Sequence, residues 1–179
     1  LIFASDGQET LYTGSAFLGE DAYLRFEGEG TWTLLDSLNA DRLSFSNGYL
    51  DLNAQAVNLG DNGNIYDYGD SKDTIDMVGA RIYLEDFYGG NSEYLTDSST
   101  VYFVDDNSNY FNGQGKIYEK IVIMGDLYFG SHSNQIPWLE IHPGADVRFP
   151  SNHSQEVDTL IANGTKLAPI TLRSNNEGT

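Results

Sequence analysis

The sequence predicts an all-β protein built as a β-solenoid, on three observations. Apolar–x–apolar triplets recur along the whole chain of 179 residues, and each predicts a very short strand with one buried face. Turn-forming Gly, Asn, Asp and Ser residues separate these triplets, which often start only 6 to 12 residues apart. No stretch has a convincing amphipathic helix pattern; the nearest are NADRLSF (39–45) and SQEVDTLIANG (154–164).

The triplets mark the predicted strands and their orientation. In chain order they are Leu24–Phe26, Trp32–Leu34, Leu43–Phe45, Leu50–Leu52, Val57–Leu59, Ile75–Met77, Ile82–Leu84, Val101–Phe103, Ile121–Ile123, Leu127–Phe129, Leu139–Ile141, Val147–Phe149 and Ile170–Leu172. In each triplet the two flanking residues share one face, and the central residue points to the other face. The residues predicted to point into the core include Leu43, Phe45, Ile82, Leu84, Ile121, Ile123, Val147 and Phe149.

Two all-β architectures fit this rhythm. An antiparallel β-sandwich needs strands of about 5–8 residues joined by hairpin turns. A β-solenoid needs short strands, frequent corners and three faces per coil of roughly 20–25 residues. The brevity of the triplets favours the solenoid, in which each coil covers its neighbours and the inward residues form one apolar column. The β-sandwich is the alternative.

Composition restricts the possible partners. The chain carries 9 Lys and Arg against 27 Asp and Glu, which gives a formal net charge of −18. Such a chain repels nucleic-acid backbone and anionic lipid, so both are excluded as partners. Without cysteine there is no disulfide or thiolate metal site, so packing or bound ions must stabilise the fold. No apolar run reaches transmembrane length, and the length suits one domain over residues 1–179.

Several stretches resemble a known family. GTWTLLDSL and LSFSNGYLDLNAQAVNLG, within residues 30–60, are similar to a G-x-W-x-L-x-D-x-L pattern followed by an apolar strand and G-x-L-D-L-N. YFNGQGKIYEKIVIMGDLYF (110–129), LEIHPGADVRF (139–149) and DTLIANGTKLAPITLRSNNEGT (158–179) are similar to further coils of that family. The family is the large surface proteins of the Bacteroidota that the type IX system exports.

This resemblance implies a right-handed parallel β-helix similar in shape to pectate lyases. Members commonly serve as adhesins or cell-surface scaffold, so the resemblance implies an extracellular or cell-surface location. It also implies further domains of the same polypeptide as partners, because chains of this family normally continue beyond the PITLRSNNEGT stretch. Surface glycans or other cell-surface proteins are the remaining candidate partners.

The acidic stretch GDNGNIYDYGDSKDTIDM (60–77) predicts either a solvated loop or a calcium site. Calcium takes six to eight oxygen ligands, and Asp61, Asp67 and Asp70 are the candidates, with calcium as the candidate cofactor. The residue order does not match an EF-hand loop. In a solenoid the stretch is expected to protrude as a polar loop between Leu59 and Ile75, and the plain loop is the favoured interpretation.

Catalysis is disfavoured by the same residues. Lyases that act on acidic sugars need basic residues beside their carboxylates, and the nine basic residues of this chain are scattered. His132, His142 and His153 lack H-x-H or H-E-x-x-H spacing. They are expected to ligate zinc only if the fold brings them together with an acid such as Glu140. No catalytic or cofactor-binding residue is therefore predicted.

Tyrosines at the centre of triplets are predicted to point outward. Tyr83, Tyr102 and Tyr128 occupy such positions and are expected to line one lateral face. A face of this kind suits sugar stacking, but it also suits contact with a neighbouring domain. Both interpretations remain open.

Three hydroxyl residues are candidates for modification. Ser37, Thr74 and Thr159 each follow an aspartate and precede an apolar residue, a triplet that resembles the O-glycosylation signal of exported Bacteroidota proteins. Thr74, at the end of the acidic stretch, is expected to be the most accessible, followed by Ser37 and then Thr159.

These observations together predict a non-enzymatic structural or adhesive module of a large secreted or cell-surface protein. One alternative is a carbohydrate-binding or polysaccharide-cleaving β-helix, which predicts aromatic and acidic side chains converging on one lateral sheet. The other is a calcium-dependent β-sandwich adhesin, which predicts antiparallel strand pairs.

Overall fold

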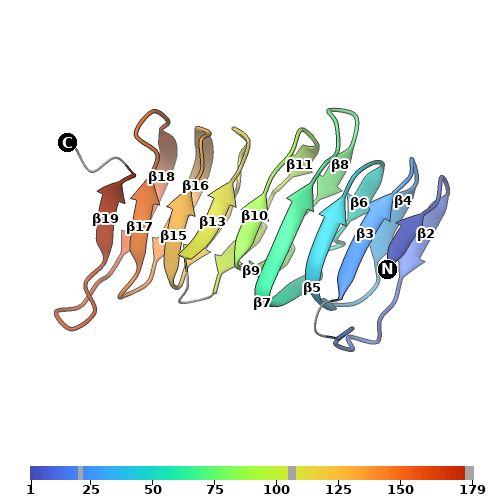
Figure 1. Ribbon diagram of the computed structural model, residues 1–179, viewed down its shortest axis with the longest axis horizontal. Coiled ribbons are helices and arrows are strands. Elements are labelled where there is room, and N and C mark those ends of the chain that lie inside the picture. Colours follow the sequence, from blue (N-terminus) through green and yellow to red (C-terminus); the bar gives the residue numbers. More distant parts are fainter. Residues whose placement is uncertain (20–21, 105–107, 176–179) are drawn as a thin grey trace.

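The computed structural model describes residues 1–19, 22–104 and 108–175, without the side chains of residues 61, 62 and 108. This part of the chain is all-β with no helix, and its strands stack as a right-handed parallel β-helix of about 8 turns. The turns lie side by side along the long axis, and the two chain ends lie at opposite ends of that axis (Figure 1). The predicted fold class is confirmed. The β-sandwich alternative is wrong, because the described strand pairings are parallel.

Three lateral faces, named A, B and C, form the walls of the solenoid. Face A contains β1 (Ile2–Ala4), β3 (Tyr23–Glu27), β10 (Asp86–Tyr88), β13 (Ser108–Asn112), β15 (Asp126–Phe129), β17 (Asp146–Phe149) and β19 (Thr171–Ser174). Face B contains β9 (Arg81–Leu84), β12 (Thr100–Phe103), β14 (Lys120–Ile123), β16 (Asn134–Ile141) and β18 (Gln155–Ala162). Face C contains β2 (Gln8–Leu11), β4 (Thr31–Leu34), β6 (Tyr49–Asp51), β8 (Thr74–Asp76) and β11 (Glu93–Leu95).

Two long strands, β5 (Leu38–Phe45) and β7 (Ala56–Asp67), turn the corner between faces A and B. The first part of β7 pairs with β9 on face B, and its last part pairs with β10 on face A. The pairing of β5 with β7 shifts register between Ala40 and Arg42, where the chain changes face. Faces A and B therefore form one continuous sheet.

The length of one turn follows from the strand register. A short turn leads from Tyr110 to its partner Tyr128, and a long turn leads from Arg148 to its partner Arg173. Both are close to the coil length that the sequence predicts. Turns differ in length in the corner segments between strands, so the paired strands keep their register.

The core consists of the inward residues of all three faces. Seven of the eight residues predicted to point inward are at most 2% exposed: Leu43, Phe45, Ile82, Leu84, Ile121, Ile123 and Val147. The eighth, Phe149, is partly buried and stacks on Phe129 with ring centroids 5.0 Å apart. The predicted core is confirmed, and its alternation with outward residues follows from the two-residue repeat of a strand.

The acidic stretch is not a protruding loop. Residues 60–67 continue β7, and only the segment between β7 and β8 is a turn. Ile65 points inward opposite Phe87 of the next turn, and Tyr66 points outward. The loop prediction was wrong because Gly and Asn residues hide the alternation here, and because the next inward residue is Asp67 rather than an apolar residue.

The two stretches nearest to a helix pattern are strands. NADRLSF lies within β5, and most of SQEVDTLIANG forms β18. In β18, Val157 pairs with buried Ile136 and packs against the core, whereas Leu160, which pairs with buried Leu139, is 53% exposed. The charged residues at alternate positions of β18 occupy the outward face, so their spacing gave a false impression of helical amphipathicity.

Candidate functional site

A column of four tyrosines lies on the outer surface of face A, and we name it the tyrosine stripe. Its members, from β7, β10, β13 and β15 in turn, are Tyr66, Tyr88, Tyr110 and Tyr128. Successive ring centroids are 4.8, 5.2 and 5.8 Å apart. In β10, Phe87 is fully buried beside outward Tyr88, and this alternation is what turns the tyrosine rings away from the core.

Strand register aligns the stripe with the solenoid axis. Tyr66 lies opposite Tyr88, and Tyr110 lies opposite Tyr128. Between these pairs, Tyr110 lies opposite Asp86, so the rings of Tyr88 and Tyr110 meet diagonally. The four rings therefore form one stack that crosses four successive strands of the sheet.

The stacking determines which atoms of the stripe a partner can contact. The interplanar angles are 4°, 34° and 24° along the stripe, so the faces of the inner rings lie against neighbouring rings. The outer surface presents ring edges and hydroxyl groups, and Tyr128 is 37% exposed. A sugar ring cannot stack flat on the inner rings, so contacts to the stripe are made through edges and hydroxyl hydrogen bonds.

Asp86 places a carboxylate within the stripe. Its Oδ1 accepts the backbone N–H of Tyr110 at 2.7 Å, and its Oδ2 accepts the hydroxyl of Tyr88 at 3.2 Å. Burial raises the pKa of the Asp86 carboxyl, although both hydrogen bonds act to lower it. Burial and the Asp86 carboxylate together raise the pKa of Tyr88 to about 12, so this hydroxyl remains a hydrogen-bond donor at neutral pH.

Several aspartates hold neighbouring turns together through backbone hydrogen bonds. Asp86 binds the next turn in this way, and Asp126 Oδ1 likewise accepts the N–H of Asp146 at 2.9 Å. Asp36 and Asp73 accept N–H groups of the preceding turn, from Thr13 at 2.9 Å and from Gly48 at 2.8 Å. These carboxylates therefore have a structural role, which fits their positions at strand ends and corners.

Two arginines continue the row beyond the stripe. Register places Arg148 opposite Tyr128, and Arg173 opposite Arg148. Both contact Asp146: Arg148 Nη2 lies 3.3 Å from Oδ2, and Arg173 Nε donates to Oδ1 at 2.9 Å. Burial acts to raise the pKa of the Asp146 carboxyl, but the guanidinium groups of Arg173 and Arg148 outweigh it and lower the pKa.

Replacing Asp146 with asparagine is expected to lower the free energy of unfolding at neutral pH by about 1 kcal/mol or less, because half-exposed ion pairs are weak. The folded-state pKa is lowered, so this stabilisation is fully present above the usual value of 3.8 and is lost as the pH falls through the lowered value. Urea unfolding should thus show wild type and variant converging in acid, with the exposed Asp158→Asn as control. A difference that persists in acid would exclude the ion pairs as its cause.

The three tyrosines predicted to share one face lie on two faces. Tyr83 and Tyr102 stack on face B with ring centroids 4.6 Å apart, whereas Tyr128 belongs to the stripe on face A. The prediction of one shared face was wrong, because consecutive triplets lie on different walls of the solenoid. The sequence does not indicate to which of the three lateral faces a triplet belongs, so triplets cannot be assigned to faces from their spacing alone.

Three members of the stripe were not predicted. Tyr88 and Tyr110 lie in strands that lack the apolar–x–apolar triplet, and Tyr66 lies in β7 beyond the Val57–Leu59 triplet of that strand. The available signal was an aromatic or aliphatic residue directly beside a tyrosine, as in Ile65-Tyr66 and Phe87-Tyr88, recurring at about one coil length.

Asp67 ends β7 with its side chain inside the solenoid, and it is only 6% exposed. Its carboxylate accepts the N–H groups of Gly69 and Gly90 at 2.8 and 2.9 Å, and the hydroxyls of Ser92 and Tyr94 at 2.7 and 2.5 Å. Gly90 approaches so closely that a Cβ there would collide with the Asp67 backbone. Asp67 therefore joins the turn after β7 to the turn before β11.

The candidate calcium ligands have protein donors where they can be described. Both oxygens of Asp67 face N–H or O–H groups, and the exposed Asp70 accepts the N–H of Lys72 at 2.7 Å. Among the described residues, no three His, Cys, Asp or Glu side chains are grouped for metal binding. The side chain of Asp61 lies outside the described residues, so calcium binding by Asp61, Asp67 and Asp70 stays a prediction.

Two of the three histidines lie together. His132 and His153 are on successive turns, with ring centroids 6.2 Å apart. His142 is separate from them: its Nε2 lies 3.2 Å from Oε1 of Glu140. The fold thus brings a histidine pair together without Glu140.

The three candidate modification sites differ in their local structure. Ser37 precedes β5, Thr74 begins β8, and Thr159 lies within β18, and all three are partly exposed. Thr74 therefore lies in a strand and not in the loop that its ranking assumed. Glycosylation of Ser37, Thr74 and Thr159 stays a prediction.

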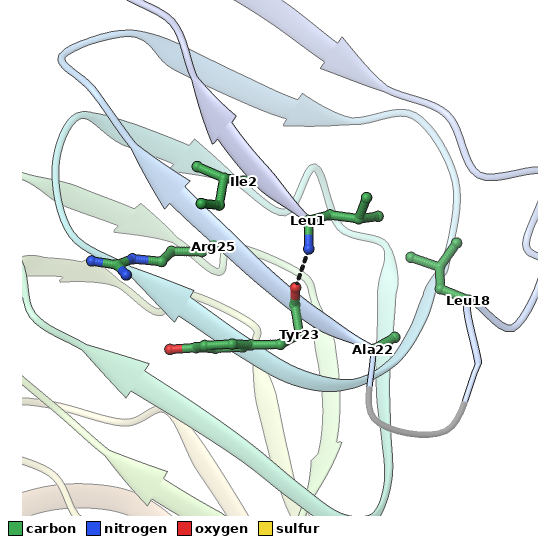
Figure 2. A pocket seen from close by; sticks show the side chains of 6 residues that line it. All are labelled: Leu1, Ile2, Leu18, Ala22, Tyr23 and Arg25. Carbon is green, nitrogen blue, oxygen red and sulfur yellow. Dashed lines mark hydrogen bonds between the residues drawn. The ribbon is translucent and has the colours of Figure 1, made fainter.

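A cavity of about 430 Å³ lies at the N-terminal end of the solenoid. Figure 2 shows its lining, which is Leu1, Ile2, Leu18, Ala22, Tyr23 and Arg25. The amino group of Leu1 donates to the carbonyl of Tyr23 at 2.7 Å, which fixes β1 against β3. Leu1 and Ile2 are 71% and 66% exposed, so this end of the stack presents apolar side chains to the outside.

Comparisons of the chain with protein-family models, curated proteins and solved structures find no match. In the part of the chain that the structure describes, no helix has the length and apolarity to cross a membrane. The fold and the stripe define the class: a parallel β-helix with a stacked aromatic column on one lateral face.

Proposed function

We propose that this chain is a non-enzymatic structural and adhesive module of a large secreted or cell-surface protein, and that the tyrosine stripe is its contact surface. The stack of Tyr66, Tyr88, Tyr110 and Tyr128 is the observation that carries the proposal. Tyrosine is enriched at protein interfaces because it offers a large rigid surface together with a hydroxyl group. Stacking fixes these rings in advance, so little side-chain entropy is lost when a partner binds.

The carboxylates on the same face favour binding over catalysis. Asp86 and Asp126 each accept a backbone N–H of the neighbouring turn, which accounts for one oxygen of each side chain. Asp146 binds two arginines. A general acid or base needs a carboxyl that is free to exchange a proton with substrate, and these groups are engaged in holding the coils together.

The solenoid ends support the structural half of the proposal. Among the described strands, β1, β18 and β19 each pair on one side only, so their outer edges have no neighbouring strand. Such edges can pair with a further coil, which would also cover the apolar side chains of Leu1 and Ile2. The proposed partners at these ends are further domains of the same polypeptide.

The proposed location is extracellular or cell-surface, and the resemblance to type IX-exported surface proteins of the Bacteroidota supports it. The proposed partners of the stripe are surface glycans or other cell-surface proteins. Carbohydrate binding is the second candidate function, because a row of tyrosine hydroxyls with Asp86 and Arg148 nearby offers both donors and acceptors to sugar hydroxyls.

Replacing Tyr88 and Tyr110 together with serine is expected to weaken partner binding about tenfold or more, because central tyrosines of a contact surface carry much of its affinity. The labelled chain would be applied to a glycan array and to cell monolayers. The matched control is the double replacement of Tyr83 and Tyr102 with serine, which removes the stacked pair of face B.

The two double variants separate the possible outcomes. Loss confined to the Tyr88/Tyr110 variant supports the stripe, and the array then distinguishes glycan from protein partners. Equal retention of binding by both variants, with melting temperatures showing both folded, would exclude the stripe as the contact surface.

A further inference from the structure

Two imidazole side chains lie one above the other on successive turns of the solenoid. His132 precedes β16 and His153 precedes β18, and these two strands pair in register from Asn134 opposite Gln155. The ring centroids of the two histidines are 6.2 Å apart and the rings are inclined by 30°. His153 is exposed and His132 is partly exposed, so an ion from solution can reach both.

The orientation of His132 is set by a hydrogen bond from its other nitrogen. Nδ1 lies 2.7 Å from Oδ1 of Asn112, one turn earlier. An amide oxygen only accepts hydrogen bonds, so Nδ1 carries the proton and Nε2 keeps its lone pair. Metal-binding histidines are typically held in this way, by a hydrogen bond from the nitrogen that does not bind the metal.

Side-chain hydrogen bonds also fix the two turns against each other. The carbonyl of His132 accepts Nδ2 of Asn134 at 3.2 Å and Nε2 of Gln155 at 2.8 Å. The backbone N–H of Ser154 donates to Oγ of Ser133 at 3.1 Å. The backbone positions from which the two imidazoles project are therefore held by hydrogen bonds between the turns.

We propose that His132 and His153 form a binding site for a divalent transition-metal ion, with zinc as the representative. Two imidazoles that share one tetrahedral zinc through bonds of about 2.0–2.1 Å have ring centroids about 5 Å apart. The observed centroid separation is 6.2 Å, and rotation of the exposed His153 side chain brings its ring closer to the ring of His132. Water completes the coordination shell, because the pair provides two protein ligands.

The chemistry of the pair selects the class of ion. Imidazole nitrogen suits zinc, copper and nickel, whereas calcium and magnesium prefer oxygen. The net charge of −18 raises the local concentration of any dication near the surface. The third histidine lacks these features, because Nε2 of His142 faces Glu140, which also binds Lys120 at 2.9 Å.

Calorimetric titration of the intact chain with zinc chloride tests the site. Excess magnesium is present to occupy the surface carboxylates. We expect one saturable zinc ion per chain, and we expect His132→Asn and His153→Asn each to abolish it. The matched control His142→Asn should bind zinc as the wild type does.

Asn112→Ala tests the orienting hydrogen bond separately. It should weaken zinc binding about 10- to 100-fold, as expected for the loss of a partner that positions a metal ligand. Zinc should raise the melting temperature of the wild type and of His142→Asn, but not that of His153→Asn. No saturable binding in the wild type, binding that survives both His132→Asn and His153→Asn, or equal loss in His142→Asn would each overturn the proposal.

Discussion

Replacing Phe45 with alanine is expected to lower the free energy of unfolding by about 3–5 kcal/mol. The side chain is fully buried, and register places it between Phe26 on the preceding turn and Asp67 on the next. Truncation leaves a cavity that the neighbouring strands cannot close, because their backbones are held by pairing on both sides. Urea denaturation followed by circular dichroism measures the loss.

Phe17 provides the control for this substitution. It is 54% exposed, so Phe17→Ala should change the unfolding free energy by only about 0.5 kcal/mol. Similar losses for the two variants would mean that the inward column is not the main source of stability. A loss at Phe45 well below the expected range would mean that the register assigned to face A is wrong.

Replacing Asp67 with alanine is expected to lower the free energy of unfolding by about 3–5 kcal/mol, although its hydrogen-bond partners in the described part of the chain are uncharged N–H and O–H groups. Its removal leaves the N–H groups of Gly69 and Gly90 and the hydroxyls of Ser92 and Tyr94 without their acceptor. An unpaired buried polar group costs about 1–3 kcal/mol, and only the hydroxyls can turn toward new partners. Thermal and urea unfolding both measure the effect.

Asp70→Ala is the matched control, because Asp70 is exposed and accepts a single N–H from Lys72. It should be nearly neutral if Asp67 acts through hydrogen bonds alone. Destabilisation by both substitutions, reproduced in the wild type by a calcium chelator, would instead support the predicted calcium site. The comparison of the two variants therefore distinguishes a purely hydrogen-bonding role of Asp67 from calcium binding by the acidic stretch.

The period-two alternation made most of the core predictable. Leu43 and Phe45, or Ile121 and Ile123, are flanking apolar residues of short triplets, and burial of such residues follows from strand geometry. What alternation does not specify is which wall a strand belongs to. Tyr102 and Tyr128 therefore looked equivalent in sequence, although they lie on different faces.

The tyrosine stripe was only partly predictable for the same reason. A stack depends on the register of successive turns, and turn lengths vary from one coil to the next. The hydrogen-bond donors of Asp67 could not be predicted from sequence, because Gly90, Ser92 and Tyr94 come from the following turn. Neighbours that are distant in sequence decide whether such a carboxylate is a surface group or part of the core.

The arrangement of the chain ends has a mechanical consequence. The ends lie at opposite ends of the long axis, so tension between them runs along the direction in which the turns are stacked (Figure 1). The hydrogen bonds between turns are then loaded in series, and a turn whose strand pairs on one side only, as β1 and β19 do among the described strands, carries the load with the fewest contacts. A turn that detaches releases its whole contour length, about 60–90 Å at about 3.3–3.6 Å per residue. A solenoid of this kind can lengthen under tension turn by turn while its remaining turns stay folded.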